Sequence, residues 1–312
     1  MARPEEPTGK PPGKPAGAPS SEEIRQPTGW PAQAPPTPAP RKVYPSQVSL
    51  TGGPTPFDRQ WEKPSSQLVL LPEADLEAMT RALAKSTARG VLCTLGLREE
   101  QVVALRAGLS RPLSVRRPLH PLLAPATPIH SRLVSDYRGK DYTVAEIGTW
   151  AGELGLSPRY CDALEQALDE MLLNALFAAP RTPEGLPRYS HFSASDRLTV
   201  RAPPDEQAVV RFAADPKRIV IAVRDRFGAL RASTVLGYLI RCSESQRLRK
   251  SPIEAKISGS GVGLFLITSS ASELLFRLRR GRLTELVFAL YRDRPRPLRA
   301  LVFDDDASLP RR

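Results

Sequence analysis

A long amphipathic helix followed by two β-hairpins is the feature that most constrains the fold of this chain. Apolar residues recur at helical spacing from about Pro158 to Ala178, and a proline ends the segment. Two pairs of apolar strands follow, within residues 209–223 and 273–291, and each pair is joined by a short polar turn. The sequence therefore predicts an α+β fold over residues 141–295, a two-layer sandwich with helices on one face of a mixed, mostly antiparallel sheet.

The two ends of the chain differ in composition from this segment. Residues 1–64 hold 16 of the 33 prolines and few aliphatic residues, so they cannot bury enough apolar surface to fold. We therefore expect a disordered, Pro-rich tail over residues 1–65. After the last hairpin, we expect a second tail over residues 296–312.

Residues 66–140 alternate between strand-like and helix-like patterns. Apolar runs at 67–72 and 90–95 predict strands, and each run is followed by a predicted helix, at 73–85 and 98–109. This order predicts a small α/β segment, which a proline-containing connector completes. A degenerate receiver-like unit is one interpretation. A structural spacer or docking module is the other, because no acidic cluster follows either strand.

Composition limits the partners and the compartment. The formal net charge of +12 suits an anionic nucleotide or an acidic protein partner. The basic residues are dispersed and no aromatic platform accompanies them, which disfavours nucleic acid. Cys93, Cys161 and Cys242 are isolated, so we expect reduced thiols, no disulfide and no zinc site. No apolar run approaches the roughly 20 residues of a membrane span, and we expect a cytoplasmic protein.

Two polar residues stand at the edge of the apolar face of the helix over residues 158–178. Glu170 and Asn174 are four positions apart, so both side chains project from the same side of the helix. An amide oxygen can ligate Mg²⁺, a hard cation that prefers oxygen, and a carboxylate can accept the proton of an attacking hydroxyl. Such a pair suits phosphoryl transfer, although a Glu and an Asn on a helix are most often plain polar surface.

A third polar residue ends an apolar strand. Asp225 closes the second strand of the first hairpin, and Arg226, Phe227, Gly228 and Ala229 follow it. An aspartate in this place commonly caps the turn with its own side chain. The residue alone does not separate this structural interpretation from a binding role.

Three glycines precede an apolar helix between the two hairpins. Gly259, Gly261 and Gly263 alternate with other residues at the start of the helix predicted for 262–270. Glycine permits positive φ and close backbone approach, and a helix N-terminus offers free N–H groups to phosphate oxygens. An isolated motif of this kind would favour a hinge, so its weight comes from the residues upstream.

These three segments, the Glu170–Asn174 pair, Asp225 and the three glycines, occur in the order found in the nucleotide site of the GHKL ATPase superfamily, which they resemble. This superfamily includes gyrase, chaperone ATPases and histidine kinases. The sequence Glu-Met-Leu-Leu-Asn-Ala looks like the family's N-box, which implies that Asn174 binds Mg²⁺ and that Glu170 acts as the base. Asp225 matches the aspartate that accepts a hydrogen bond from the adenine amino group. The three glycines match the family's second glycine box, which binds the phosphates of ATP.

The resemblance is partial around the aspartate. The family pattern Asp-x-Gly-x-Gly has Phe227 and Ala229 at its two glycine positions here, with Gly228 between them as a further candidate for the ATP site. Phe227 either packs under the adenine or blocks the pocket. Thr284 stands where the family often places a threonine near the adenine. The basic stretch between Leu230 and Ser258 matches the position of the family's lid.

Within the superfamily, the compact form of this chain looks most like the anti-sigma-factor serine kinases. No histidine lies on a convincing helix before the ATPase segment, so autophosphorylation on His is disfavoured. The resemblance implies that Mg²⁺-ATP donates its γ-phosphate to a Ser or Thr of a regulatory protein partner. A nucleotide-dependent interaction switch with little turnover stays open, and so do a basic nucleic-acid-binding scaffold on an inactive fold and a homodimer.

Overall fold

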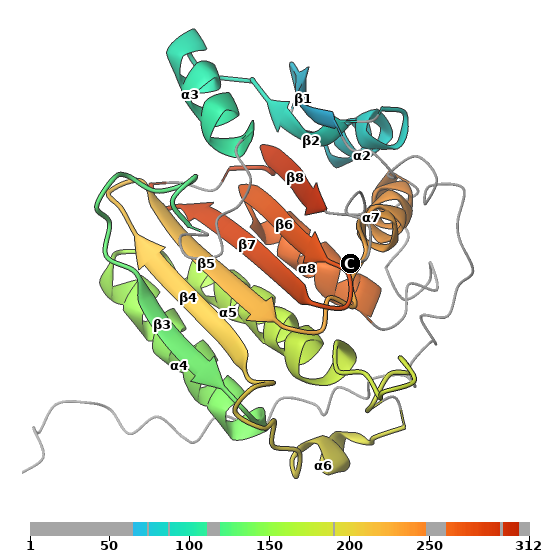
Figure 1. The fold of residues 1–312 in the computed structure, drawn as a ribbon. Helices are drawn as coiled ribbons and strands as arrows, with labels where there is room; N and C mark the ends of the chain where they lie inside the picture. The colour runs from blue at the N-terminus through green and yellow to red at the C-terminus, as the bar shows by residue number, and fades with distance from the viewer. Residues whose placement is uncertain are drawn as a thin grey trace, which may run out of the picture. The chain divides into compact units, whose positions relative to one another are not determined.

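An eight-stranded sheet organises the chain in its computed structural model (Figure 1). The structure describes residues 65–73, 75–86, 88–110, 119–189, 191–247, 260–293 and 296–305. The predicted tail lies outside these ranges up to residue 64, and so do Gly259 and residues 248–258 of the predicted lid.

The sheet is mixed and mostly antiparallel, as the sequence predicts. Its strand order is β1-β2-β8-β6-β7-β5-β4-β3. The β1–β2 and β6–β8 pairs are parallel, and the other neighbouring pairs are antiparallel. The strands are β1 (Ser65–Leu71), β2 (Ala88–Cys93), β3 (His130–Val134), β4 (Ala208–Ala214), β5 (Arg218–Asp225), β6 (Glu273–Arg279), β7 (Leu283–Tyr291) and β8 (Ala300–Asp305). Both predicted hairpins and the α+β class are confirmed.

Five helices share one apolar core with one face of the sheet, the face turned away from the viewer in Figure 1. They are α2 (Leu76–Ala84), α4 (Tyr137–Glu153), α5 (Pro158–Leu173), α7 (Ala232–Arg247) and α8 (Ser260–Ser270). Leu168 of α5 and Ile267 of α8 pack in this core with Ile221, Phe276 and Phe288 of the central strands. A short helix, α6 (Ala194–Arg197), lies in the segment between α5 and β4.

The second face of the sheet is also partly covered, which the sequence does not predict. Helix α3 (Glu99–Ser110) places Leu105 and Leu109 on this face, and Leu119 and Leu122 of the following segment join them. The cause is that the central strands carry apolar residues on both faces; every residue of β6 except its last is buried. Two-sided burial requires a cover on each side.

Two strands lie where the sequence predicts none. β8 occupies part of the predicted tail 296–312, lies between β2 and β6, and buries Leu301, Val302 and Phe303 completely or almost so. The apolar run of β8 is short and follows prolines and arginines, so its hydrophobic pattern does not predict a strand. β3 lies in the predicted connector and is an edge strand whose first four residues are exposed, so no apolar alternation marks it.

The predicted α/β segment contributes its strands to the same sheet. Strands β1 and β2 pair in parallel, with α2 between them in the chain, and β2 then pairs with β8. The sheet therefore runs across the boundary that the sequence places at residue 140.

Candidate functional site

Asp225 and Thr284 lie directly opposite each other in the antiparallel β5–β7 pair. Side chains alternate along a strand, and Val223 and Leu286, two positions away, belong to the core beneath the helices. Asp225 and Thr284 therefore face the helices too, and they are only 6% and 7% exposed. The register places these two predicted site residues together on the inner side of the sheet.

The Asp225 carboxylate organises the turn that follows it. Its Oδ1 atom accepts the backbone N–H groups of Phe227, at 2.8 Å, and of Gly228, at 3.2 Å. The turn-capping interpretation is thus confirmed, and a hydrogen bond to adenine stays a prediction. Burial raises the pKa of Asp225 to about 6, against these N–H groups and Thr284, which favour the ionised form. A carboxylate held in this state binds an added hydrogen-bond donor favourably, because the donor compensates the buried charge.

Gly228 fits its position because no other residue has room there. Its φ is +57°, and a Cβ atom would lie 2.0 Å from the carbonyl oxygen of Arg279. The backbone oxygen of Gly228 also accepts the N–H of Gly281, at 3.2 Å. The turn after Asp225 is therefore pressed against the β6–β7 turn, which gives Gly228 a structural role whether or not it contacts a nucleotide.

Phe227 contacts the loop that follows α5. The guanidinium carbon of Arg188 lies 5.9 Å from the centre of the Phe227 ring, within cation–π range. Glu206 holds Arg188 through both of its carboxylate oxygens, one of them at 3.0 Å. The Phe227 ring thus lies beside an arginine that is itself paired with Glu206.

Helix α5 ends in a π-helical turn, Asn174–Ala178, that begins at the predicted Mg²⁺ ligand. Its defining bond runs from the N–H of Ala179 to the carbonyl oxygen of Asn174, at 2.8 Å. Such turns are rare and occur frequently at functional sites. Asn174 is half-buried, and no hydrogen bond joins its side chain to another residue that the structure describes. The turn contacts β5, the strand that ends in Asp225.

Arg181, which the sequence does not single out, lies near Asp225. Its Nη1 atom donates to the carbonyl oxygens of Ala178, at 2.8 Å, and Pro180, at 3.4 Å. Burial lowers the pKa of Arg181, and the negative charge of Asp225 opposes that shift. No sequence pattern identifies Arg181 as a site residue, because it follows a proline in an irregular loop.

Glu170 meets the first turn of α8. A Cβ atom added at Gly263 would lie 2.4 Å from Oε2 of Glu170 and 3.3 Å from its Cβ. The absence of a side chain at Gly263 therefore lets α5 approach α8 and places the Glu170 carboxylate beside the start of that helix. The first turn of a helix offers backbone N–H groups to anions. A phosphate bound there would lie next to the Glu170 carboxylate.

The structure brings predicted site residues together in two separate pairs and places a further one on a turn that contacts β5. Glu170 and Gly263 join α5 to α8, Asn174 lies on the turn that contacts β5, and Asp225 pairs with Thr284. Gly261 lies in the first turn of α8, at its second residue.

Comparison with known proteins gives no family assignment. No model of a known protein family matches the chain, and a search of curated proteins finds no significant match. Within the residues that the structure describes, no helix is long and apolar enough to cross a membrane. In the same residues, no three His, Cys, Asp or Glu side chains are grouped so that they could hold a metal ion by themselves.

Proposed function

We propose that the chain is a GHKL-type ATP-binding protein that transfers the γ-phosphate of Mg²⁺-ATP to a Ser or Thr of a regulatory protein partner. The observation that carries this proposal is the shared orientation of Asp225 and Thr284, which lie opposite each other and face the helices. Adenine bound there would meet a buried acceptor, Asp225, and the phosphates of the same nucleotide would bind at the N-terminus of α8.

In this proposal each polar group in the site binds a particular part of the nucleotide. The Asp225 carboxylate accepts the exocyclic amino group of adenine, and Thr284 lies beside it. The backbone N–H groups at the start of α8 bind phosphate oxygens. Arg181 adds a positive charge close to Asp225 and can donate to a ring nitrogen of the base.

Asn174 fits a magnesium ion that is held jointly with the phosphates. Its amide oxygen is a hard ligand, and its side chain makes no hydrogen bond with another described residue. Mg²⁺ usually keeps several waters and takes one or two protein ligands plus substrate phosphates, so a single amide is sufficient. The ion would neutralise charge on the β- and γ-phosphates.

In this proposal Glu170 accepts the proton of the attacking hydroxyl group. The hydroxyl oxygen of the partner's Ser or Thr attacks the γ-phosphorus, and the bond from that phosphorus to the bridging oxygen of ADP breaks. The hydroxyl proton passes to the Glu170 carboxylate, which lies beside the first turn of α8. ADP leaves with the electron pair of the broken bond.

A nucleotide-dependent switch with little turnover is the second candidate, and the surroundings of Phe227 favour it. The ring stands where the family has a glycine, and it lies within cation–π range of Arg188. Such a site can bind nucleotide without presenting it correctly to an acceptor.

Single-turnover hydrolysis of γ-labelled ATP separates the two candidates. A kinase site hydrolyses ATP slowly without its partner, and Glu170→Gln lowers that rate about 100-fold while ATP still binds. If the wild-type rate equals the Glu170→Gln rate, Glu170 is not a base and the switch is the better account.

A further inference from the structure

Two consecutive residues of α5 contact two different helices. Successive side chains of an α-helix point about 100° apart, because one turn contains 3.6 residues. The Glu170 side chain meets Gly263 at the start of α8. The preceding side chain, Asp169, forms an ion pair with Lys140 of α4. The rotation of α5 about its own axis, which orients the Glu170 carboxylate, is therefore restricted from both sides.

Lys140 is buried to an extent that is unusual for a lysine. Its side chain is 2% exposed, and its Nζ atom contacts Asp141 Oδ1, at 2.7 Å, as well as Asp169. The same atom lies 4.4 Å from the centre of the Tyr137 ring, within cation–π range. Lysines are almost never fully buried unless they are paired. Burial alone would lower the pKa of Lys140, but the two aspartates outweigh burial and raise the pKa, so the lysine stays charged.

The first turn of α4 contacts the same helical segment at a second place. Asp136 caps this turn, and its carbonyl oxygen accepts the N–H of Lys140, at 3.0 Å. The centre of the Tyr137 ring lies 6.3 Å from that of the Phe177 ring, on the π-helical turn that begins at Asn174. The start of α4 therefore contacts the segment that carries the proposed base and the proposed magnesium ligand at both of its ends.

A buried ion pair of this kind adds little to stability but constrains geometry. The cost of removing two charges from water is similar to the energy that their attraction returns, so apolar residues often replace such a pair without loss of stability. The pair instead favours the arrangements in which the ammonium group and the carboxylate meet. For Lys140 and Asp169, those are the arrangements in which α5 presents Glu170 to α8.

We propose that Lys140 is a positioning residue that orients Glu170, through Asp169, towards the start of α8. The inference rests on the proposed function, in which Glu170 accepts a proton beside phosphates bound at that helix. In this role Lys140 affects the rate of phosphoryl transfer rather than the affinity for ATP, because affinity depends on Asp225 and on the backbone of α8. A misplacement of about 1 Å in a reacting group can lower a rate up to about 100-fold.

The test variant is Lys140→Met with Asp169→Ala, which removes both charges of the buried pair. Its melting temperature stays close to that of the wild type, because the pair contributes little to stability. Single-turnover ATP hydrolysis falls about tenfold, while the affinity for ATP changes less than about threefold. If the double variant does not fold, Asp169→Asn takes its place, at a side chain that is 31% exposed, with a loss of about threefold.

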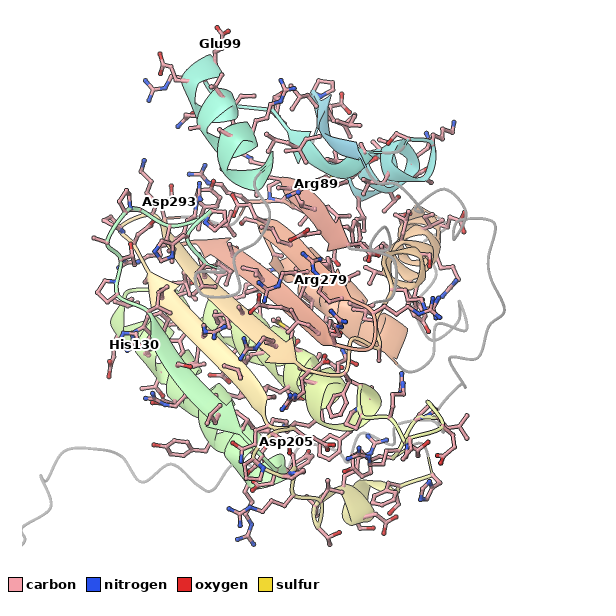
Figure 2. The ribbon with its side chains drawn as sticks, viewed as in Figure 1. Arg89, Glu99, His130, Asp205, Arg279 and Asp293 are labelled. Carbon is pink, nitrogen blue, oxygen red and sulfur yellow. The ribbon has the colours of Figure 1, made fainter. Side chains whose placement is uncertain are left out.

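The matched control removes an ion pair that joins α4 to a strand rather than to α5. Arg132 Nε of β3 lies 3.0 Å from Oε2 of Glu146 on α4. Figure 2 labels His130, two residues before Arg132 on this edge strand; the strand lies in front of α4, and α5 lies towards the middle of the sheet. Arg132→Met with Glu146→Ala leaves the rate of hydrolysis within about twofold of the wild type.

The Glu170→Gln background separates an effect through Glu170 from a general effect on the protein. In that background, Lys140→Met with Asp169→Ala lowers the rate less than about twofold further, because the proposed base is already absent. Losses that multiply would overturn the proposal, since Lys140 would then act independently of Glu170. An equal loss in the control variant would overturn it too.

A measurement without nucleotide keeps this test apart from that of the kinase proposal. A Cβ atom at Gly263 would lie 3.3 Å from Cβ of Glu170, so an α-proton of Gly263 gives a strong NOE to the β-protons of Glu170 in the wild type. This NOE weakens in the Lys140→Met/Asp169→Ala variant and persists in the control.

The two measurements fail in different ways. An unchanged NOE in the double variant would show that Lys140 does not position Glu170, whatever the ATP experiments give. A weakened NOE together with a Glu170→Gln rate equal to that of the wild type would keep the positioning by Lys140 and would contradict only the role of Glu170 as the base.

Discussion

Gly263 on α8 lies so close to Glu170 on α5 that a Cβ atom at position 263 would stand 2.4 Å from Oε2 of the glutamate. The glycine of a proposed phosphate-binding turn and the carboxylate of the proposed base are thus in direct steric contact. A side chain at position 263 would therefore displace the Glu170 carboxylate.

Gly263→Ala should therefore reduce turnover more than nucleotide affinity. The added methyl group displaces the Glu170 carboxylate, while the backbone N–H groups of α8 remain. We expect at least a tenfold loss in single-turnover ATP hydrolysis and less than a threefold change in ATP affinity. Gly237→Ala on α7 is the control, because its Cβ would meet only Arg241 Nη1, at 3.7 Å. That substitution should raise stability by about 0.5–1 kcal/mol and leave hydrolysis unchanged.

Gly228→Ala should destabilise the protein strongly. The substitution combines a positive φ of +57° with a backbone clash of 2.0 Å against the carbonyl oxygen of Arg279. We expect a loss on the order of 3 kcal/mol in the free energy of unfolding, measured by urea denaturation. Gly281→Ala has a similar φ of +66° but no atom within 4 Å of the added Cβ, so it should lose only about 1 kcal/mol. Equal losses would mean that the clash is relieved and that the turn is less tightly packed than described.

The stability of the chain should respond to the titration of Asp225. Its pKa is about 6 in the folded protein, above the ordinary value of 3.8, so the folded state holds the proton more tightly than the unfolded state. The stability that protonation gives is present below about pH 4 and is lost as the pH rises through 6. Asp225→Asn removes this dependence. The unfolding free energy of the variant minus that of the wild type should therefore increase by about 2 kcal/mol from pH 4 to pH 8. A constant difference across this range would mean that the carboxylate is not desolvated.

β8 should be essential to folding although the sequence gives it the appearance of a tail. Leu301 is fully buried, so Leu301→Ala should lower the unfolding free energy by about 3 kcal/mol. Leu186→Ala makes the same chemical change at a residue that is 57% exposed, and it should change stability by less than about 0.5 kcal/mol. Similar melting temperatures for the two variants would contradict the placement of β8 inside the sheet.

Much of the α+β core follows from periodicity. In α5 and in the four strands of the two hairpins, apolar residues recur over short stretches of sequence. These elements can therefore be recognised from the sequence alone. The sequence does not predict β3 and β8, for opposite reasons. β3 is an exposed edge strand without an apolar face, and β8 is a short buried strand whose partners β2 and β6 are remote in sequence.

The candidate site also has features that the sequence reveals and features that only the tertiary structure reveals. The Glu170–Asn174 spacing is visible on a helix, but the opposition of Asp225 and Thr284 depends on the register of two strands that are not consecutive. The π-helical turn and Arg181 depend on tertiary packing around a proline, and no local pattern encodes them. The alternation of Arg224, Glu285, Arg277 and Asp304 across the sheet likewise appears only when four strands are aligned.

Calorimetric titration of ATP into the protein, with and without Mg²⁺ and beside Asp225→Asn, tests the central claim most directly. We predict Mg²⁺-dependent binding to the wild type and at least a 30-fold weaker affinity in the variant, because about 2 kcal/mol is lost with the buried acceptor. The greater stability expected for the variant at neutral pH excludes unfolding as the cause of that loss. Equal binding by both proteins, or no binding at millimolar ATP, would contradict a nucleotide site at Asp225.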